Sequence, residues 1–131
     1  MTATETQKIA KELANTLQKG DVLALHGDLG AGKTTFVKAA ASLLAPNALV
    51  QSPTFTYLNI YEASPPLFHF DLYRLQSEKK FIEMGFLDYL YSEEGVCFIE
   101  WPECIEALLP EKTKHIRLSH TENGGRAIDV Y

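Results

Sequence analysis

The sequence has 131 residues, of which 46% are hydrophobic and 22% charged. Length and composition predict one globular domain spanning residues 1–131 and exclude a disordered or fibrous chain. The 12 basic residues stand against 17 acidic ones, so the net charge is −5. Tight nucleic-acid binding usually needs a basic face, and we therefore expect no direct tight contact with nucleic acid.

Cysteine usage and hydropathy indicate the compartment. Cys97 and Cys104 are too few for a disulfide framework, and their spacing fits no zinc pattern, so we expect two reduced, mostly buried thiols. Residues 1–19 are too polar for a signal peptide, and no apolar run reaches the roughly 18 residues that a membrane span needs. These observations predict a cytoplasmic protein without a membrane segment.

The chain begins with a helix and a strand. Residues 4–18 carry apolar side chains at helical spacing, with Thr4 and Gln7 as a capping pair and Gly20 as a stop signal. Val22–His26 is then a nearly continuous apolar run, which is typical of a strand buried on both faces in a parallel sheet.

A glycine-rich turn and a second amphipathic helix, ending at Pro46-Asn47, come next. The same criteria predict strands at 49–50, 57–61, 67–72 and 96–99, a helix over 81–90 interrupted at Gly85, a short helix at 102–109, and a hairpin of 115–119 with 127–131. This order predicts an α/β fold with a mixed, mainly parallel central sheet, flanking helices and a C-terminal β-hairpin. The strands 57–61 and 67–72 are expected to pair as a further hairpin.

The turn after the first strand is the most specific feature. It matches G-x-x-x-x-G-K-[ST] in full, with Gly27, Asp28, Leu29, Gly30, Ala31, Gly32, Lys33 and Thr34, and Thr35 follows directly. The backbone N–H groups and the helix N-terminus would hold phosphate oxygens, Lys33 would span the β- and γ-phosphates, and Thr34 would ligate Mg²⁺. Thr35 either contacts the α-phosphate or begins the helix. We expect a P-loop NTPase-like domain with a nucleotide site.

Hydrolysis also needs a carboxylate near the metal and a group that positions water. Glu100 ends one apolar strand, and Asp71 ends another that contains His69 on the same face. The residues alone leave open which carboxylate ligates the metal and which positions water. Thr54 lies in a loop where switch-type NTPases place a threonine that completes the Mg²⁺ shell.

Four motifs together resemble the TsaE family of small bacterial P-loop ATPases that act in tRNA threonylcarbamoyladenosine synthesis: 27–35, Ser52-Pro53-Thr54-Phe55, His69-Phe70-Asp71-Leu72-Tyr73-Arg74 and Glu100-Trp101. The resemblance implies slow, Mg²⁺-dependent hydrolysis of ATP to ADP and phosphate. It also implies association with a TsaB–TsaD heterodimer, which transfers threonylcarbamoyl to adenosine 37 of tRNA. Separately, we expect the protein alone to be a monomer or weak oligomer.

The resemblance also implies roles for individual residues. Thr54 lies in a switch-like loop, Asp71 is important for activity, and Glu100 takes the Walker B-like position beside Mg²⁺. With Lys33 these form the expected catalytic set, and Thr34 with Glu100 the expected metal ligands. Arg126, in the hairpin, either helps to frame the nucleotide base or is a surface arginine.

Two other P-loop classes are the alternatives. A small-molecule kinase needs an acceptor pocket and usually a lid that carries arginines, and the chain has only Arg74, Arg117 and Arg126. A regulatory GTPase carries [NT]-K-x-D, whereas Thr113-Lys114-His115-Ile116 lacks the aspartate. The kinase is therefore the main alternative to the ATPase.

Overall fold

The structure is a computed structural model that describes residues 3–28, 32–47, 57–120 and 126–130. The strand predicted at 49–50 lies outside these residues. The elements in chain order are α1 (Ala3–Ala14), β1 (Val22–His26), α2 (Lys33–Leu44), β2 (Leu58–Tyr61), β3 (Leu67–Asp71), α3 (Glu78–Glu83), α4 (Leu87–Leu90), β4 (Val96–Glu100), the 3₁₀ helix η1 (Pro102–Leu108), β5 (Lys114–His120) and β6 (Arg126–Val130).

The strands form one six-stranded sheet in the order β2-β3-β4-β1-β5-β6. The four central strands run parallel, whereas β2 and β6 pair antiparallel at the two edges. The predicted mixed, mainly parallel sheet and both hairpins are thus confirmed. In the central register Glu100 lies between Asp71 and Leu25, and His26 lies beside Arg117, so these strand ends share one edge of the sheet.

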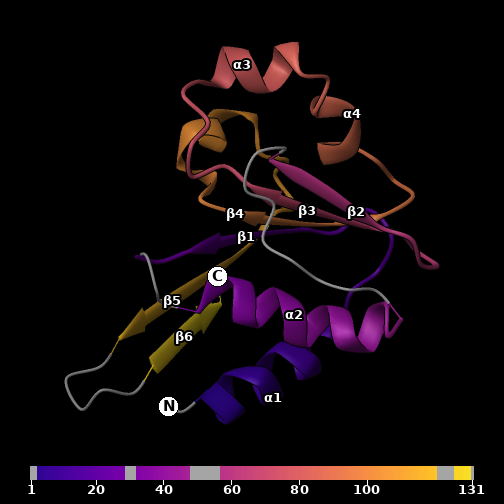
Figure 1. Cartoon of the computed structure of the whole chain (residues 1–131), viewed down its shortest axis with the longest axis vertical. Coiled ribbons are helices and arrows are strands. Elements are labelled where there is room, and N and C mark those ends of the chain that lie inside the picture. Colours follow the sequence, from indigo (N-terminus) through magenta and orange to yellow (C-terminus); the bar gives the residue numbers. More distant parts are fainter. Residues whose placement is uncertain (1–2, 29–31, 48–56, 121–125, 131) are drawn as a thin grey trace.

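Helices cover both faces of this sheet. Figure 1 shows α1 and α2 on one face and α3 and α4 on the other. Alternating strand residues supply the two cores: Leu23 and Leu25 pack in the cluster that contains Phe36 of α2, whereas Val22 packs in the cluster that contains Phe81 of α3. Because side chains alternate along a strand, residues next to each other in sequence serve different layers.

The prediction for the first helix needed correction at both ends. The first helix ends at Ala14 rather than residue 18, because the chain tightens into i→i+3 bonds, and the Thr16 hydroxyl bonds the carbonyl of Leu13. Thr4 lies inside this helix and does not precede it. The predicted interruption at Gly85 is confirmed, since its φ of +78° separates α3 from α4.

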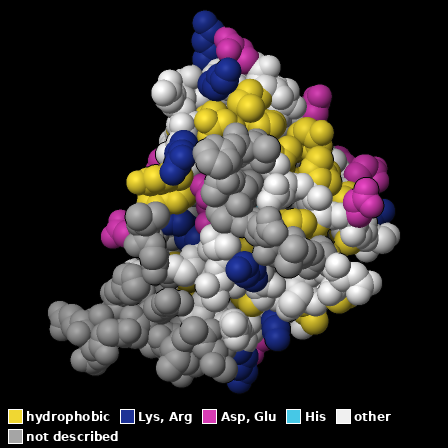
Figure 2. All heavy atoms as spheres, viewed as in Figure 1, with side chains coloured by type: hydrophobic (Ala, Val, Ile, Leu, Met, Phe, Trp, Pro, Cys, Tyr) yellow, Lys and Arg dark blue, Asp and Glu magenta, His cyan; other side chains and the backbone are white. Residues whose placement is uncertain are grey.

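The surface carries mixed charge. Figure 2 shows Lys and Arg side chains set singly or in small groups over one face, with Asp and Glu among them. No helix of the described residues combines the length and hydropathy that a membrane crossing requires. Cys97 is buried and Cys104 half-buried, and both are free thiols.

Candidate functional site

The glycine-rich segment lies between a buried strand and a long helix. All five residues of β1 are buried, and α2 begins directly at Lys33. Gly27 and Gly32 have φ angles of +150° and +99°, a range that favours glycine. This strand–turn–helix geometry aims the positive end of α2 at the turn. Leu29, Gly30 and Ala31, predicted to contact phosphate, lie outside the described residues.

Lys33 is drawn inward rather than extended into solvent. Only 5% of the residue is exposed, and its Nζ donates to the carbonyl oxygens of Gly27 and Asp28, the latter at 3.2 Å. The same Nζ lies 3.5 Å from the centroid of the Trp101 ring, a cation–π contact. Burial lowers the pKa of Lys33, and the nearby Glu100 carboxylate opposes that shift. The ammonium is thus held at the turn.

Glu100 and Thr34 meet at the carboxyl end of β4. The Thr34 hydroxyl donates to Glu100 Oε1 at 2.8 Å, and Glu100 is only 3% exposed. The two residues predicted as metal ligands are thus brought together by elements 66 residues apart. Thr35 lies in the first turn of α2 and is half-buried.

Two further side chains hold the other oxygen of Glu100. His69 Nε2 lies 2.6 Å from Oε2, and the Tyr61 hydroxyl lies 2.9 Å from His69 Nδ1. Sequence reasoning noted His69 only as a neighbour of Asp71 and missed Tyr61. The signal that could have found Tyr61 is the antiparallel pairing of β2 with β3, which sets Tyr61 opposite Leu67, two residues before His69.

Asp71 lies beside Glu100 but makes different contacts. The two residues are register partners on β3 and β4. Asp71 is only partly buried, and its Oδ1 accepts from the backbone N–H of Tyr73 at 3.1 Å. Its charge also acts to raise the pKa of Lys33, so both predicted carboxylates face the same ammonium.

Two predicted residues fall outside what the structure describes. Thr54 belongs to the segment 48–56, and Arg126 begins β6 opposite His120, but its side chain is not among those described. Their predicted roles, in completing the Mg²⁺ shell and in framing the base, remain predictions.

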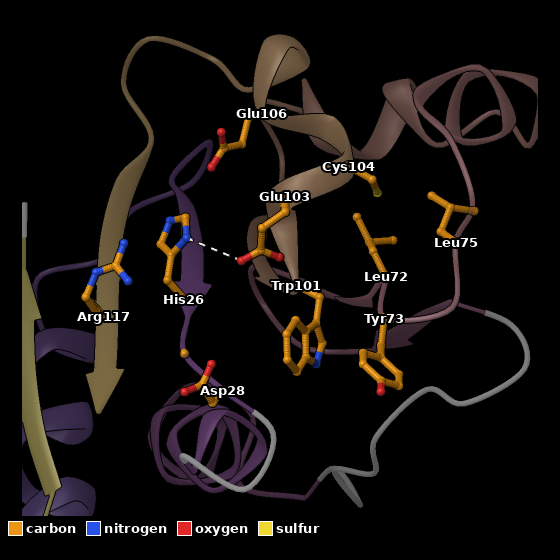
Figure 3. A pocket seen from close by; sticks show the side chains of 11 residues that line it. His26, Asp28, Leu72, Tyr73, Leu75, Trp101, Glu103, Cys104, Glu106 and Arg117 are labelled. Atoms are coloured by element: carbon orange, nitrogen blue, oxygen red, sulfur yellow. Dashed lines mark ion pairs between the residues drawn. The ribbon is translucent and has the colours of Figure 1, made fainter. Parts of the chain in front are cut away.

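A cavity of about 570 Å³ opens beside the turn on the η1 side of the sheet. Figure 3 shows the rings of Tyr73 and Trp101 on one wall, with centroids 4.9 Å apart, and His26 on the opposite wall. His26 Nδ1 lies 3.7 Å from Glu103 Oε1, and its Nε2 lies 2.9 Å from His115 Nδ1. Burial, followed by the charge of His115, lowers the pKa of His26.

Three features define the class of this protein. They are a buried parallel strand, a glycine turn with a lysine and a threonine, and a carboxylate on the neighbouring strand. Together they are those of an α/β protein of the P-loop class. Within that class, the model of one family, "Threonylcarbamoyl adenosine biosynthesis protein TsaE", matches residues 1–128. The chain belongs to the TsaE family, which confirms the resemblance expected from the motifs.

Individual relatives agree with this assignment. A protein from Bacillus subtilis named tRNA threonylcarbamoyladenosine biosynthesis protein TsaE is 42% identical over 95% of this chain and 77% of its own length. A protein of the same name from Treponema pallidum is 40% identical over 98% of this chain and 94% of its own. The crystal structure of Bacillus subtilis YdiB superposes with a TM-score of 0.81 at 37% identity, covering 98% of this chain and 78% of that one.

Proposed function

We propose that this protein is a cytoplasmic, Mg²⁺-dependent ATPase that serves as an accessory factor in threonylcarbamoyladenosine modification of tRNA position 37. It would act on a complex of the TsaB–TsaD type rather than on tRNA directly. The observation that carries the ATPase assignment is the 2.8 Å hydrogen bond from Thr34 to Glu100 at the start of α2, beside the buried Lys33. Family membership supports the pathway and the partners.

The donor set at this position suits a magnesium ion. Mg²⁺ prefers hard oxygen ligands and keeps several waters, so it needs only one or two groups from the protein. Thr34 directs its hydroxyl proton to Glu100, which leaves the oxygen lone pairs of Thr34 available to a cation. When bound, the ion would neutralise charge on the β- and γ-phosphates.

The residues of this chain have separable tasks in that reaction. Lys33 would exchange the carbonyl oxygens of Gly27 and Asp28 for phosphate oxygens, which are stronger acceptors because they are charged. The contact of Glu100 with Thr34 supports Glu100 as the carboxylate at the metal. Asp71 is more exposed than Glu100 and lies on β3, one strand further from β1. Asp71 is then the candidate for positioning the attacking water.

One observation favours a small-molecule kinase as the second candidate. The cavity of about 570 Å³ beside the turn is large enough for a small phosphate acceptor. ATP labelled in its γ-phosphate separates the two functions when it is incubated with the protein, Mg²⁺ and a metabolite extract. We expect label in free phosphate, whereas label on a small metabolite would replace the ATPase assignment.

The partner and nucleotide assignments are tested with purified TsaB and TsaD. We expect ATP to be bound more tightly than GTP in calorimetry, and ATP to change the amount of this protein recovered with TsaB–TsaD. Lys33→Ala is the matched control that should lose the effect of ATP. A clear preference for GTP, or a recovery that ignores nucleotide, would contradict the proposal.

A further inference from the structure

Hydrogen bonds connect four side chains across four elements on the α2 side of the sheet. They run from Tyr61 on β2 through His69 on β3 and Glu100 on β4 to Thr34 on α2, with donor–acceptor distances of 2.9, 2.6 and 2.8 Å. We call these four side chains the buried polar network. Two of its members, Tyr61 and His69, have no task in the proposed function so far.

The chemistry of the groups fixes how the network is oriented. A carboxylate only accepts, so His69 Nε2 carries a hydrogen and donates it to Glu100 Oε2, while Thr34 donates to Oε1. In the neutral imidazole, His69 Nδ1 then accepts from the Tyr61 hydroxyl. Each carboxylate oxygen of Glu100 therefore accepts from a different donor. The imidazole ring of His69, which supplies one of the donors, is itself held by the Tyr61 hydroxyl at its other nitrogen.

Burial makes this arrangement sensitive to the loss of any one member. His69 is 0% exposed, Glu100 3% and Tyr61 7%, so bulk water cannot readily replace a missing donor. The neighbouring inward positions of the same strands, Leu67 and Phe98, are apolar and fully buried. A polar group in such surroundings is costly unless it is paired, and pairing here depends on a single geometry.

We infer that His69 is a positioning residue for the metal side of the nucleotide site, and that Tyr61 fixes the orientation of its ring. His69 holds the Glu100 carboxylate so that Oε1 accepts the hydrogen bond of the Thr34 hydroxyl, which would leave the lone pairs of the Thr34 oxygen available to the cation. The inference rests on the proposed function. It separates two contributions to ATP affinity: the Mg²⁺-dependent part needs His69, whereas the phosphate contact of Lys33 does not.

The test is calorimetric titration of ATP, once with excess Mg²⁺ and once with EDTA. In the wild-type protein Mg²⁺ tightens binding. Loss of a partner that orients a metal ligand typically costs about 10- to 100-fold in metal affinity, so His69→Met should lose about 10-fold or more of the Mg²⁺-dependent gain while keeping its affinity in EDTA. His69→Gln retains an N–H donor of similar reach and should recover most of the gain.

Three more variants separate positioning from folding. Tyr61→Phe removes one oxygen and should reduce the Mg²⁺-dependent gain less than His69→Met does; it also carries the test if His69→Met does not fold. Phe68→Leu changes the preceding residue, which packs on the opposite side of β3, and should lower thermal stability without changing the gain. Tyr89→Phe, outside the network, should leave both affinities unchanged.

The outcomes are distinct. A folded His69→Met protein with the full Mg²⁺-dependent gain overturns the inference. So does an equal loss of affinity in Mg²⁺ and in EDTA, because that result assigns His69 to the structure of the turn as a whole. If the wild-type protein binds no ATP under either condition, the proposed function fails and this inference with it. If it binds ATP without any gain from Mg²⁺, the Mg²⁺-dependent part of the proposed function fails together with this inference, whereas the assignment of ATP binding stands.

Discussion

The two faces of the sheet present polar side chains beside the P-loop in different ways, although alternate residues of the same strands build both. On the α2 face, His69 and Glu100 are buried and bonded at 2.6 Å. On the η1 face, His26 contacts His115 at 2.9 Å and Glu103 at 3.7 Å, beside a cavity of about 570 Å³. Glu103 has 54% of its side chain exposed.

The difference indicates where the fold fixes geometry and where it leaves room. The buried polar network is assembled by the fold itself, so a cation and phosphates would meet a site that is already oriented, which limits reorganisation during the reaction. The cluster of His26, His115 and Glu103 lies beside the cavity, and the exposed carboxylate of Glu103 can change position at little energetic cost. We expect substitutions on the α2 face to change chemistry, and substitutions on the η1 face to change mainly stability.

The largest effect is expected at Lys33, where the two faces meet. Lys33→Ala removes the cation at the P-loop, and a hydrogen bond to a charged group contributes about 1.5–3 kcal/mol, so ATP binding should weaken by about 10- to 100-fold. Calorimetry in Mg²⁺ measures this loss. Lys38→Ala, an exposed lysine on the same helix, is the matched control and should bind ATP as the wild type does. Equal affinities for both variants would remove Lys33 from the site.

The next effect concerns the two carboxylates. Glu100→Gln keeps the size of the side chain but gives Thr34 and His69 a poorer partner, so the Mg²⁺-dependent rate of hydrolysis should fall at least about 10-fold. Asp71→Asn should lower the rate at saturating ATP while leaving the Mg²⁺ concentration for half-maximal rate unchanged. Steady-state phosphate release at varied Mg²⁺ distinguishes them. The opposite pattern would exchange the roles of Glu100 and Asp71.

A smaller effect, on stability alone, is expected when a polar group is placed in the apolar core on the η1 face of the sheet. Cys97 is 2% exposed and packs in the η1-side core, where burial strongly raises the pKa of its thiol. Cys97→Ser places a hydroxyl among apolar side chains and should lower the free energy of unfolding by about 1–3 kcal/mol. Urea denaturation measures this change, with Cys97→Ala as the control for lost volume. An unchanged midpoint for the serine variant would show that this face accepts polar groups.

The smallest effect is a pH dependence of stability from His26. Burial lowers its pKa below the ordinary value of 6.5, so the unfolded chain binds the proton more readily than the folded protein does. The free energy of unfolding should therefore fall as the pH drops below 6.5, until the folded pKa is passed. Urea denaturation of wild type and His26→Gln between pH 7.5 and pH 5, a range of about 1 unit above to 1.5 units below the ordinary pKa, isolates this contribution. Parallel curves would contradict it.

Much of the site could be predicted from the sequence, because the residue patterns that specify it are local. The pattern from Gly27 to Thr34 fixes a turn between a strand and a helix, and an apolar run ending in Glu100 predicts a carboxylate at the end of a neighbouring strand. Parallel strands bring such ends to the same edge, so the contact between Thr34 and Glu100 follows from the order of the strands.

The rest depends on register and packing, which no local pattern specifies. His69 and Asp71 are two residues apart on one face, yet His69 bonds Glu100, whereas Asp71 bonds the backbone of Tyr73. The register of β3 with β4 sets Asp71, not His69, opposite Glu100, so only the side-chain packing shows which of the two bonds the carboxylate. Tyr61 enters because the edge strand runs antiparallel. The cavity on the η1 side follows from how η1 packs, and its lining is scattered along the sequence.

The backbone conformation of Trp101 predicts how this position would respond to directed evolution. Its φ and ψ are +59° and +60°, a left-handed conformation that costs a residue other than glycine about 1–2 kcal/mol. This conformation brings the indole ring beneath Lys33 directly after β4. A screen for heat resistance alone should therefore enrich glycine or asparagine at position 101, and the enriched clones should hold the Lys33 ammonium less firmly. Stability and function would select different residues at the same position.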